Sequence, residues 1–328
     1  MAEKDAKPNL SKNAPWANRF AWALLVVTFS MICVGALATS YSAEMAVPDW
    51  PTIFGHNPLL YPVGDSLEVQ DVLLVHVYRL LGFLAGGLAL VLTVLLWKSS
   101  MRRLALAVFL GYGVQEAFSG LRVLHDEILL ANLRDCAAGL FIALVAAAAI
   151  TTSARWRRAT PTDLKNTDPR LRGWTGGALV VVYVQIILGA QLRHLPVDVP
   201  VAWFGLLVWA HLIVAAVVLG LAVALFVLTG RRHGGQPGLH CRAGLLLGLV
   251  LAQVILGATG WIARFGWPIW FVNLFGRPDY TVVAEGRLQI LATTSHVAFG
   301  VLCLMAALSL ALWSREPVES VNADNPDA

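Results

Sequence analysis

Leu206-Leu207-Val208-Trp209-Ala210-His211 places one histidine inside an apolar run, and no other ionisable residue stands between Val199 and Thr229. Nearly the same line, Leu73-Leu74-Val75-His76-Val77-Tyr78, stands in the first half of the chain. The two lines indicate an internal repeat. In that repeat Tyr78 of the first half corresponds to His211 of the second.

The composition is that of a membrane protein, because 58% of the 328 residues are hydrophobic and only 13% are charged. A helix needs about 20 apolar residues to cross the hydrocarbon core of a bilayer. The sequence therefore predicts an all-α polytopic membrane protein with eight transmembrane helices in two pseudo-symmetric four-helix bundles. The eight apolar runs cover about 19–41, 72–97, 103–122, 128–150, 174–192, 200–229, 243–263 and 288–313.

Basic residues gather before the first run and in every second loop, whereas the loop 42–71 holds five acids and no Lys or Arg. Lys and Arg are retained on the cytoplasmic side of short loops. We therefore expect both termini in the cytoplasm and the chain in a bacterial-type cytoplasmic (inner) membrane. Topology alone accounts for the basic loops, so they predict no nucleic-acid partner.

The arginine-rich loop 151–173 is the largest break in hydrophobicity and divides the chain. We expect a cytoplasmic tail over 1–18, a first bundle over 19–150, a linker over 151–173, a second bundle over 174–313 and a second tail over 314–328. The four cysteines fall within helices or at the end of one, which predicts no structural disulfide. The first run lacks a small-residue cleavage site, so it predicts an uncleaved helix.

The repeat also aligns the fourth run with the eighth, which places Asp135 opposite His296 and Arg134 opposite Ser295. The second half therefore offers two intramembrane histidines where the first half offers Tyr78 with Asp135 or Arg134. In three of the runs a glutamine precedes a glycine by about one turn, which suits close packing or a large planar ligand. These glutamines are Gln115, Gln185 and Gln253.

Haem requires an apolar slot, one or two axial imidazoles and cations near its propionates. His211 and His296 are candidate axial ligands of a haem b iron, with Gln185 and Gln253 lining the slot, and Arg193 and His194 could meet the propionates. The alternatives stay open: a neutral histidine bonded across helices, and an interfacial anchor at Arg193 and His194. No carboxylate or thiol accompanies the two histidines in the sequence pattern, which disfavours copper or non-haem iron.

In the first half, Arg79 and Arg134 are charged residues within apolar helices and need partners. Asp135 and Glu116 are the available acids, so the four residues form structural pairs or receive the propionates of a substrate haem. Tyr78 is a packing residue or an iron ligand, and His76 faces another side of its helix. The remaining histidines are expected in solvated loops: His56, His125, His233 and His240.

Several short motifs of the sequence together resemble those of the haem A synthase family, and the resemblance covers nearly all of residues 19–313. They are Gly35-Ala36-Leu37-Ala38-Thr39-Ser40, Met45-Ala46-Val47-Pro48-Asp49-Trp50-Pro51, Tyr78-Arg79-Leu80-Leu81-Gly82, Gln115 to Leu124, Gln191-Leu192-Arg193-His194, Gly257 to Pro268 and Thr293-Thr294-Ser295-His296.

The resemblance implies eight helices in two bundles and oxidation of the C8 methyl of haem O to the formyl of haem A, for haem-copper oxidase biogenesis. The family's second-half histidine pair, which holds haem b, matches His211 and His296. The family has the motif Glu-x-x-His-Arg in its first half, and the corresponding residues here are Val75-His76-Val77-Tyr78-Arg79. Its fourth-helix histidine falls at Arg134 or Asp135.

The leading hypothesis is accordingly a haem A synthase-like oxidoreductase with haem b as cofactor and haem O as substrate. Its candidate catalytic residues are Tyr78, Arg79, Glu116, Arg134 and Asp135. The alternative is a non-catalytic haem b-binding relative that transfers electrons or assists oxidase assembly, and a third class is a transporter. Besides membrane lipid, the candidate partners are a haem O synthase, an electron donor and a second copy of the chain.

Overall fold

The computed structural model describes residues 14–158, 169–196, 198–232, 237–276, 278–279 and 281–314. In these ranges the chain is helical apart from turns, loops and one isolated bridge between Ile53 and His56. Helices satisfy all their internal backbone hydrogen bonds, which is why long apolar segments adopt them in a bilayer.

Eight of the described helices are long and apolar enough to cross a membrane, as predicted. The chain is an integral membrane protein of the all-α polytopic class. The helices are α1 (Ala14–Ser40), α3 (Gln70–Leu96), α4 (Arg102–His125), α5 (Ile128–Thr151), α8 (Pro169–Arg193), α9 (Val201–Arg232), α10 (Pro237–Phe265) and α12 (Arg287–Trp313).

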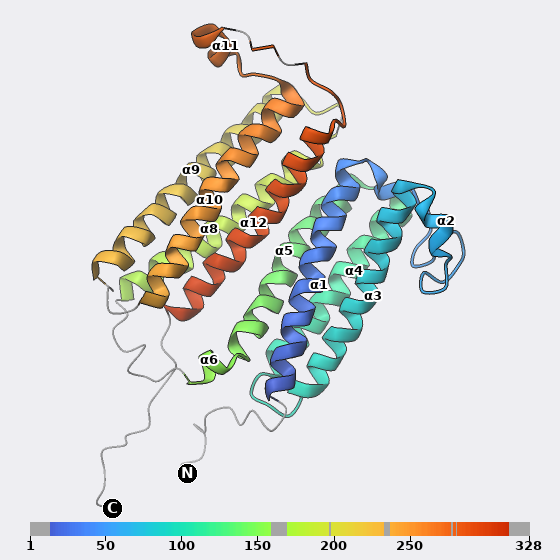
Figure 1. Ribbon diagram of the computed structural model, residues 1–328, viewed down its shortest axis with the longest axis vertical. Coiled ribbons are helices and arrows are strands. Elements are labelled where there is room, and N and C mark those ends of the chain that lie inside the picture. Colours follow the sequence, from blue (N-terminus) through green and yellow to red (C-terminus); the bar gives the residue numbers. More distant parts are fainter. Residues whose placement is uncertain are drawn as a thin grey trace, which may run out of the picture.

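The eight helices form two bundles that lie side by side (Figure 1). In the first, α1 packs on α3, α3 on α4, α4 on α5, and α5 on α1. In the second, α8 packs on α9, α9 on α10, α10 on α12, and α12 on α8. The cyclic order is the same in both, as expected of a repeat that pairs α3 with α9 and α5 with α12.

Each bundle has its own apolar core, and the two bundles meet along α1, α5, α8 and α12. Leu92, Phe141 and Ile142 are fully or almost fully buried in the first core, and Leu225 and Leu304 in the second. Small residues let the helices approach closely. α5 contributes an alanine-rich stretch of this kind, whose Ala148 and Ala149 have no exposed surface.

Four short helices were not predicted from the sequence. They are η1 (Ala43–Met45) and α2 (Val63–Leu67) after α1, α6 (Ala154–Arg158) after α5, and α11 (Ile269–Phe275) after α10. The expected linker 151–173 therefore contains α6 and the first turn of α8. Residues 1–13, 159–168 and 315–328, which hold most of the predicted tails and linker, lie outside the described residues.

Candidate functional site

His211 of α9 and His296 of α12 face each other inside the second bundle. Their ring centres are 6.3 Å apart and their planes are inclined by 56°. The repeat alignment predicted that these helices would face one another, and the structure brings the two imidazoles together. Both histidines are partly buried.

Each histidine is flanked by one of the glutamine–glycine pairs found in the sequence. The amide nitrogen of Gln185 lies 3.0 Å from Nε2 of His211, and a Cβ at Gly189 would lie 3.6 Å from Cε1 of the same ring. An amide nitrogen only donates, so Nε2 of His211 accepts this bond and is the unprotonated nitrogen of the ring. In this arrangement its lone pair is taken up by Gln185.

The second pair supports His296 in a similar way. The amide nitrogen of Gln253 donates to the backbone oxygen of His296 at 2.8 Å. A Cβ at Gly257 would lie only 3.0 Å from Cε1 of the His296 ring. A methyl group at this position would press on the ring, so glycine lets the imidazole lie against the backbone of α10.

Several polar atoms around the histidines are buried without a hydrogen-bond partner, although buried polar atoms normally have one. They are Nδ1 of His211, Nδ1 of His296, Oε1 of Gln185 and Oε1 of Gln253. These four atoms are the polar groups at the two imidazoles that are left without a partner.

These residues fit a haem iron. Two metal–imidazole bonds of about 2 Å each account for most of the 6.3 Å between the ring centres, and the rest is the distance from nitrogen to ring centre. Among the described residues, no group of three or more His, Cys, Asp or Glu could hold a metal ion. The donor set at this point is two imidazoles, which suits the axial positions of a haem.

Arg193 and His194, which the sequence placed near haem propionates, bond instead to the first bundle. Arg193 donates to the backbone oxygen of Ala36 at 2.6 Å and to the hydroxyl of Ser40 at 3.1 Å. Nε2 of His194 lies 2.9 Å from a carboxylate oxygen of Asp135. These two residues therefore join the bundles at the end of α8.

Asp135 belongs to a buried cluster of charges that also contains Arg134 and Glu44. Arg134 pairs with Glu44 at 2.5 Å and with Asp135 at 3.1 Å, and the Arg134 and Glu44 side chains are only 12% and 13% exposed. Burial alone would raise the pKa of Glu44, but the Arg134 guanidinium and the Thr39 hydroxyl outweigh it and hold this pKa below its usual value. Glu44 is the acidic partner that the sequence did not indicate.

In the first bundle, other side chains occupy the positions that correspond to the two histidines of the second bundle. The ring of Tyr78 lies so close to Gly35 that a Cβ there would be 3.1 Å from it, and the Tyr78 hydroxyl is 3.2 Å from that of Ser119. The indole of Trp50, from the loop between η1 and α2, approaches Gly120 so closely that a Cβ there would be 2.7 Å from it. Gly35 on α1 thus faces Tyr78 as Gly189 on α8 faces His211.

Arg79 holds the loop that carries Trp50, and it forms no ion pair with Asp135 or Glu116. Its guanidinium donates to the backbone oxygens of Thr52, Val47 and Asp49. In the described part of the chain this arginine satisfies its donors with carbonyl groups instead of a carboxylate. It therefore positions the loop over the first bundle.

Glu116 lies beside Arg79 at a cavity of about 210 Å³ between α3 and α4. One oxygen of its carboxyl group is buried without a partner, and a Cβ at Gly82 would be 3.2 Å from it. The lining residues are Trp50, Pro51, Arg79, Phe83, Tyr112 and Glu116. Two of the five candidate catalytic residues thus share a cavity, whereas Tyr78, Arg134 and Asp135 do not line it.

The other histidines have structural surroundings. His76 is buried, with its ring nitrogens 3.1 Å from the Ser66 hydroxyl and 2.9 Å from the Pro58 oxygen. His240 was expected in a loop, and this was wrong: it lies in the first turn of α10, where its ring stacks on Phe226. The helix begins earlier than its apolar run because Pro237 suits a first helical position.

Cys33, Cys136, Cys241 and Cys303 are all free, as predicted. His125 was also expected in a loop, and this was wrong: it is the last residue of α4. His233 lies outside the described residues. A comparison with protein-family models gives no match for the chain, and a search of curated proteins gives none either.

Proposed function

We propose that the chain is a membrane haem protein of the haem A synthase type that carries one haem b between His211 and His296 and serves in electron transfer. The observation that carries the proposal is the facing pair of imidazoles, each supported by a glutamine and set against a glycine of a neighbouring helix. When bound, haem b supplies a one-electron redox couple.

The residues of the chain would bind and orient that group. His211 and His296 would hold the iron through ring nitrogens, and binding through Nε2 of His211 would replace its present hydrogen bond from Gln185. Gln185 and Gln253 fix the positions of the two histidines, the first through the ring and the second through the backbone. Gly189 and Gly257 leave room for the rings, and the apolar faces of α9 and α12 would exclude water from the slot.

The first bundle favours this role over haem oxidation, because its own side chains occupy the corresponding positions. Tyr78 occupies the position that corresponds to His211 in the repeat, and its hydroxyl is hydrogen-bonded to that of Ser119. Trp50 covers Gly120, and Arg134 and Asp135 are held in the ion cluster with Glu44 and His194. A second haem would have to displace all of these groups.

A second candidate function is oxidation of the C8 methyl of haem O to a formyl group. The observation that favours it is the cavity in the first bundle where Arg79 lies beside the unpaired Glu116 carboxyl. A buried carboxyl without a partner is a candidate acid or base. The volume of this cavity, about 210 Å³, would hold a small molecule but not a haem macrocycle.

The proposed setting is a bacterial-type cytoplasmic membrane with both termini in the cytoplasm. This orientation is supported by the basic loops, which would lie on the cytoplasmic side with α6 and the first turn of α10. The charged cluster of Glu44, Arg134, Asp135 and His194 would lie near the external surface. A haem O synthase, an electron donor and a second copy of the chain are proposed partners.

The test separates the two functions. Full-length protein is purified in detergent from cells that also make haem O, and the extracted haems are separated by chromatography. Electron transfer predicts haem b alone, with haem O unconverted. Haem A or its hydroxylated precursor, absent from cells that produce the His296→Ala variant, would instead establish oxidation and overturn the carrier role.

A further inference from the structure

Two arginines from different bundles converge at one point of the surface. Arg155 lies on α6, at the end of the first bundle, and Arg242 lies on α10 in the second. A Cβ at Gly238 would lie 3.1 Å from Nη2 of Arg155 and 3.1 Å from Nη1 of Arg242. The two guanidinium nitrogens are therefore no more than about 6 Å apart.

Aromatic and polar groups hold the Arg242 guanidinium at this point, and the Trp313 ring also lies beside that of Arg155. The Arg242 group lies 4.6 Å from the ring centre of Trp313 and the Arg155 group 5.5 Å from it. Arg242 also donates to the Ser309 hydroxyl at 3.1 Å and to the Gly238 oxygen at 2.6 Å. Trp156 packs edge-on against Trp313, with ring centres 5.0 Å apart.

In the described part of the chain, the arrangement concentrates positive charge without a matching acid. Among the residues that the structure describes, neither arginine forms an ion pair with a carboxylate. Two like charges this close repel each other, and an anion placed between them would remove the repulsion. Arg155 is exposed, so the point is accessible from outside the protein.

We propose that Arg155 and Arg242 bind a phosphate group, and that its source is an anionic phospholipid. Guanidinium groups present paired donors that match phosphate oxygens. The point lies where α5 and α12 end and α10 begins, at one end of the long helices (Figure 1). Basic pockets between transmembrane helices on the cytoplasmic side bind anionic lipid headgroups.

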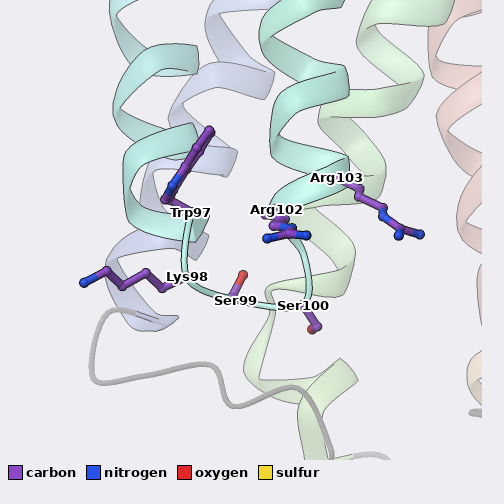
Figure 2. A pocket seen from close by; sticks show the side chains of 6 residues that line it. All are labelled: Trp97, Lys98, Ser99, Ser100, Arg102 and Arg103. Carbon is purple, nitrogen blue, oxygen red and sulfur yellow. The ribbon is translucent and has the colours of Figure 1, made fainter. Parts of the chain in front are cut away.

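A second basic group at the same side of the membrane does not share this geometry. Lys98, Arg102 and Arg103 line a shallow cavity of about 350 Å³ at the turn between α3 and α4. Figure 2 shows that the Lys98 and Arg103 side chains point away from each other. This group has a similar charge without the convergence, so it is a suitable control.

The experiment measures lipid binding by native mass spectrometry of delipidated full-length protein. The probes are phosphatidylglycerol and phosphatidylcholine, whose phosphate is neutralised by choline. We expect at least tenfold weaker phosphatidylglycerol binding in Arg155→Gln/Arg242→Gln than in the wild type, and unchanged binding in Arg102→Gln/Arg103→Gln. Arg155→Gln alone keeps the test valid if the double variant does not fold, because Arg155 is exposed.

Inorganic phosphate distinguishes the source of the group. If millimolar phosphate leaves phosphatidylglycerol bound, the ligand is the lipid headgroup. If phosphate alone binds the wild type, is lost from the Arg155→Gln variant and displaces the lipid, the site takes a soluble phosphate compound, and the lipid source is wrong. Equal binding of both lipids, or equal loss in the control variant, would overturn the proposal. None of these readings depends on haem.

Discussion

Asp135 of the first bundle lies 2.9 Å from the His194 ring of the second, across the boundary between them. In the internal repeat Asp135 occupies the position of His296. At the position of His296 the first bundle therefore has a carboxylate that connects the two halves. Arg134, which completes the cluster, links the same carboxylate to Glu44 after α1.

Arg134→Ala should destabilise the protein strongly. The substitution leaves Glu44 and Asp135 without their shared cation in a largely buried place, and removing one partner of a buried pair costs roughly 3–5 kcal/mol. The measurement is thermal or denaturant unfolding of detergent-purified protein. The matched control is Arg122→Ala, whose partner Asp126 is 72% exposed, and its expected cost is below about 1 kcal/mol. An equal loss of unfolding free energy in both variants would show that the buried cluster does not stabilise the protein more than a surface ion pair.

Because of Glu44, the free energy of unfolding should decrease as the pH is lowered below about 4.5. Its pKa is lower in the folded protein than in the unfolded chain, because the Arg134 guanidinium and the Thr39 hydroxyl outweigh the effect of burial. The stabilisation is therefore complete above the unfolded pKa of about 4.5 and is lost as the pH falls through the lower folded value. Melting temperature between pH 3 and 6 measures this. Glu44→Gln should flatten the curve, and parallel curves for the variant and the wild type would refute the assignment.

Gly257→Ala should weaken haem retention, because the new methyl group would lie 3.0 Å from Cε1 of His296 and displace the ring. We expect about a tenfold loss of affinity, which corresponds to about 1.4 kcal/mol. The measurement is haem loss to an excess of a haem-scavenging apoprotein. Gly248→Ala on the same helix is the control, since nothing lies within 4 Å of a Cβ there. If both variants release haem at the wild-type rate, the glycine has no part in the slot.

Tyr78→Phe should leave the haem content and the reduced spectrum unchanged. The Tyr78 hydroxyl is bonded to Ser119 and has no role in holding haem in this account. Its removal should cost about 1 kcal/mol of stability, the usual net value of one hydrogen bond. A lower haem content or a shifted absorption band would show that the phenol lies near an iron, and would restore the first bundle as a haem site.

Much of the fold followed from the sequence, because apolar runs in a bilayer leave the backbone little choice but a helix. All eight long helices were predicted, and the repeat indicated that α9 and α12 would bring His211 and His296 together. The apolar run did not show where α10 begins, so His240 was misplaced.

The first bundle could not be derived in the same way. Glu44 was visible only as one of five acids in a loop, and nothing local marked it as the partner of Arg134, 90 residues away. The insertion of Trp50 against Gly120 and the capture of loop carbonyls by Arg79 depend on the path of that loop. Such contacts between distant segments leave no periodic pattern in a single sequence.

We propose that His211 and His296 together hold one haem b. The most direct test is the haem content per chain, with the reduced-minus-oxidised spectrum, of wild type, His211→Ala, His296→Ala and the loop control His56→Ala. The account predicts one low-spin haem b per chain in the wild type and in His56→Ala, and its loss or a change to a high-spin spectrum in the other two variants. Wild-type haem content and spectrum in either His211→Ala or His296→Ala would contradict it.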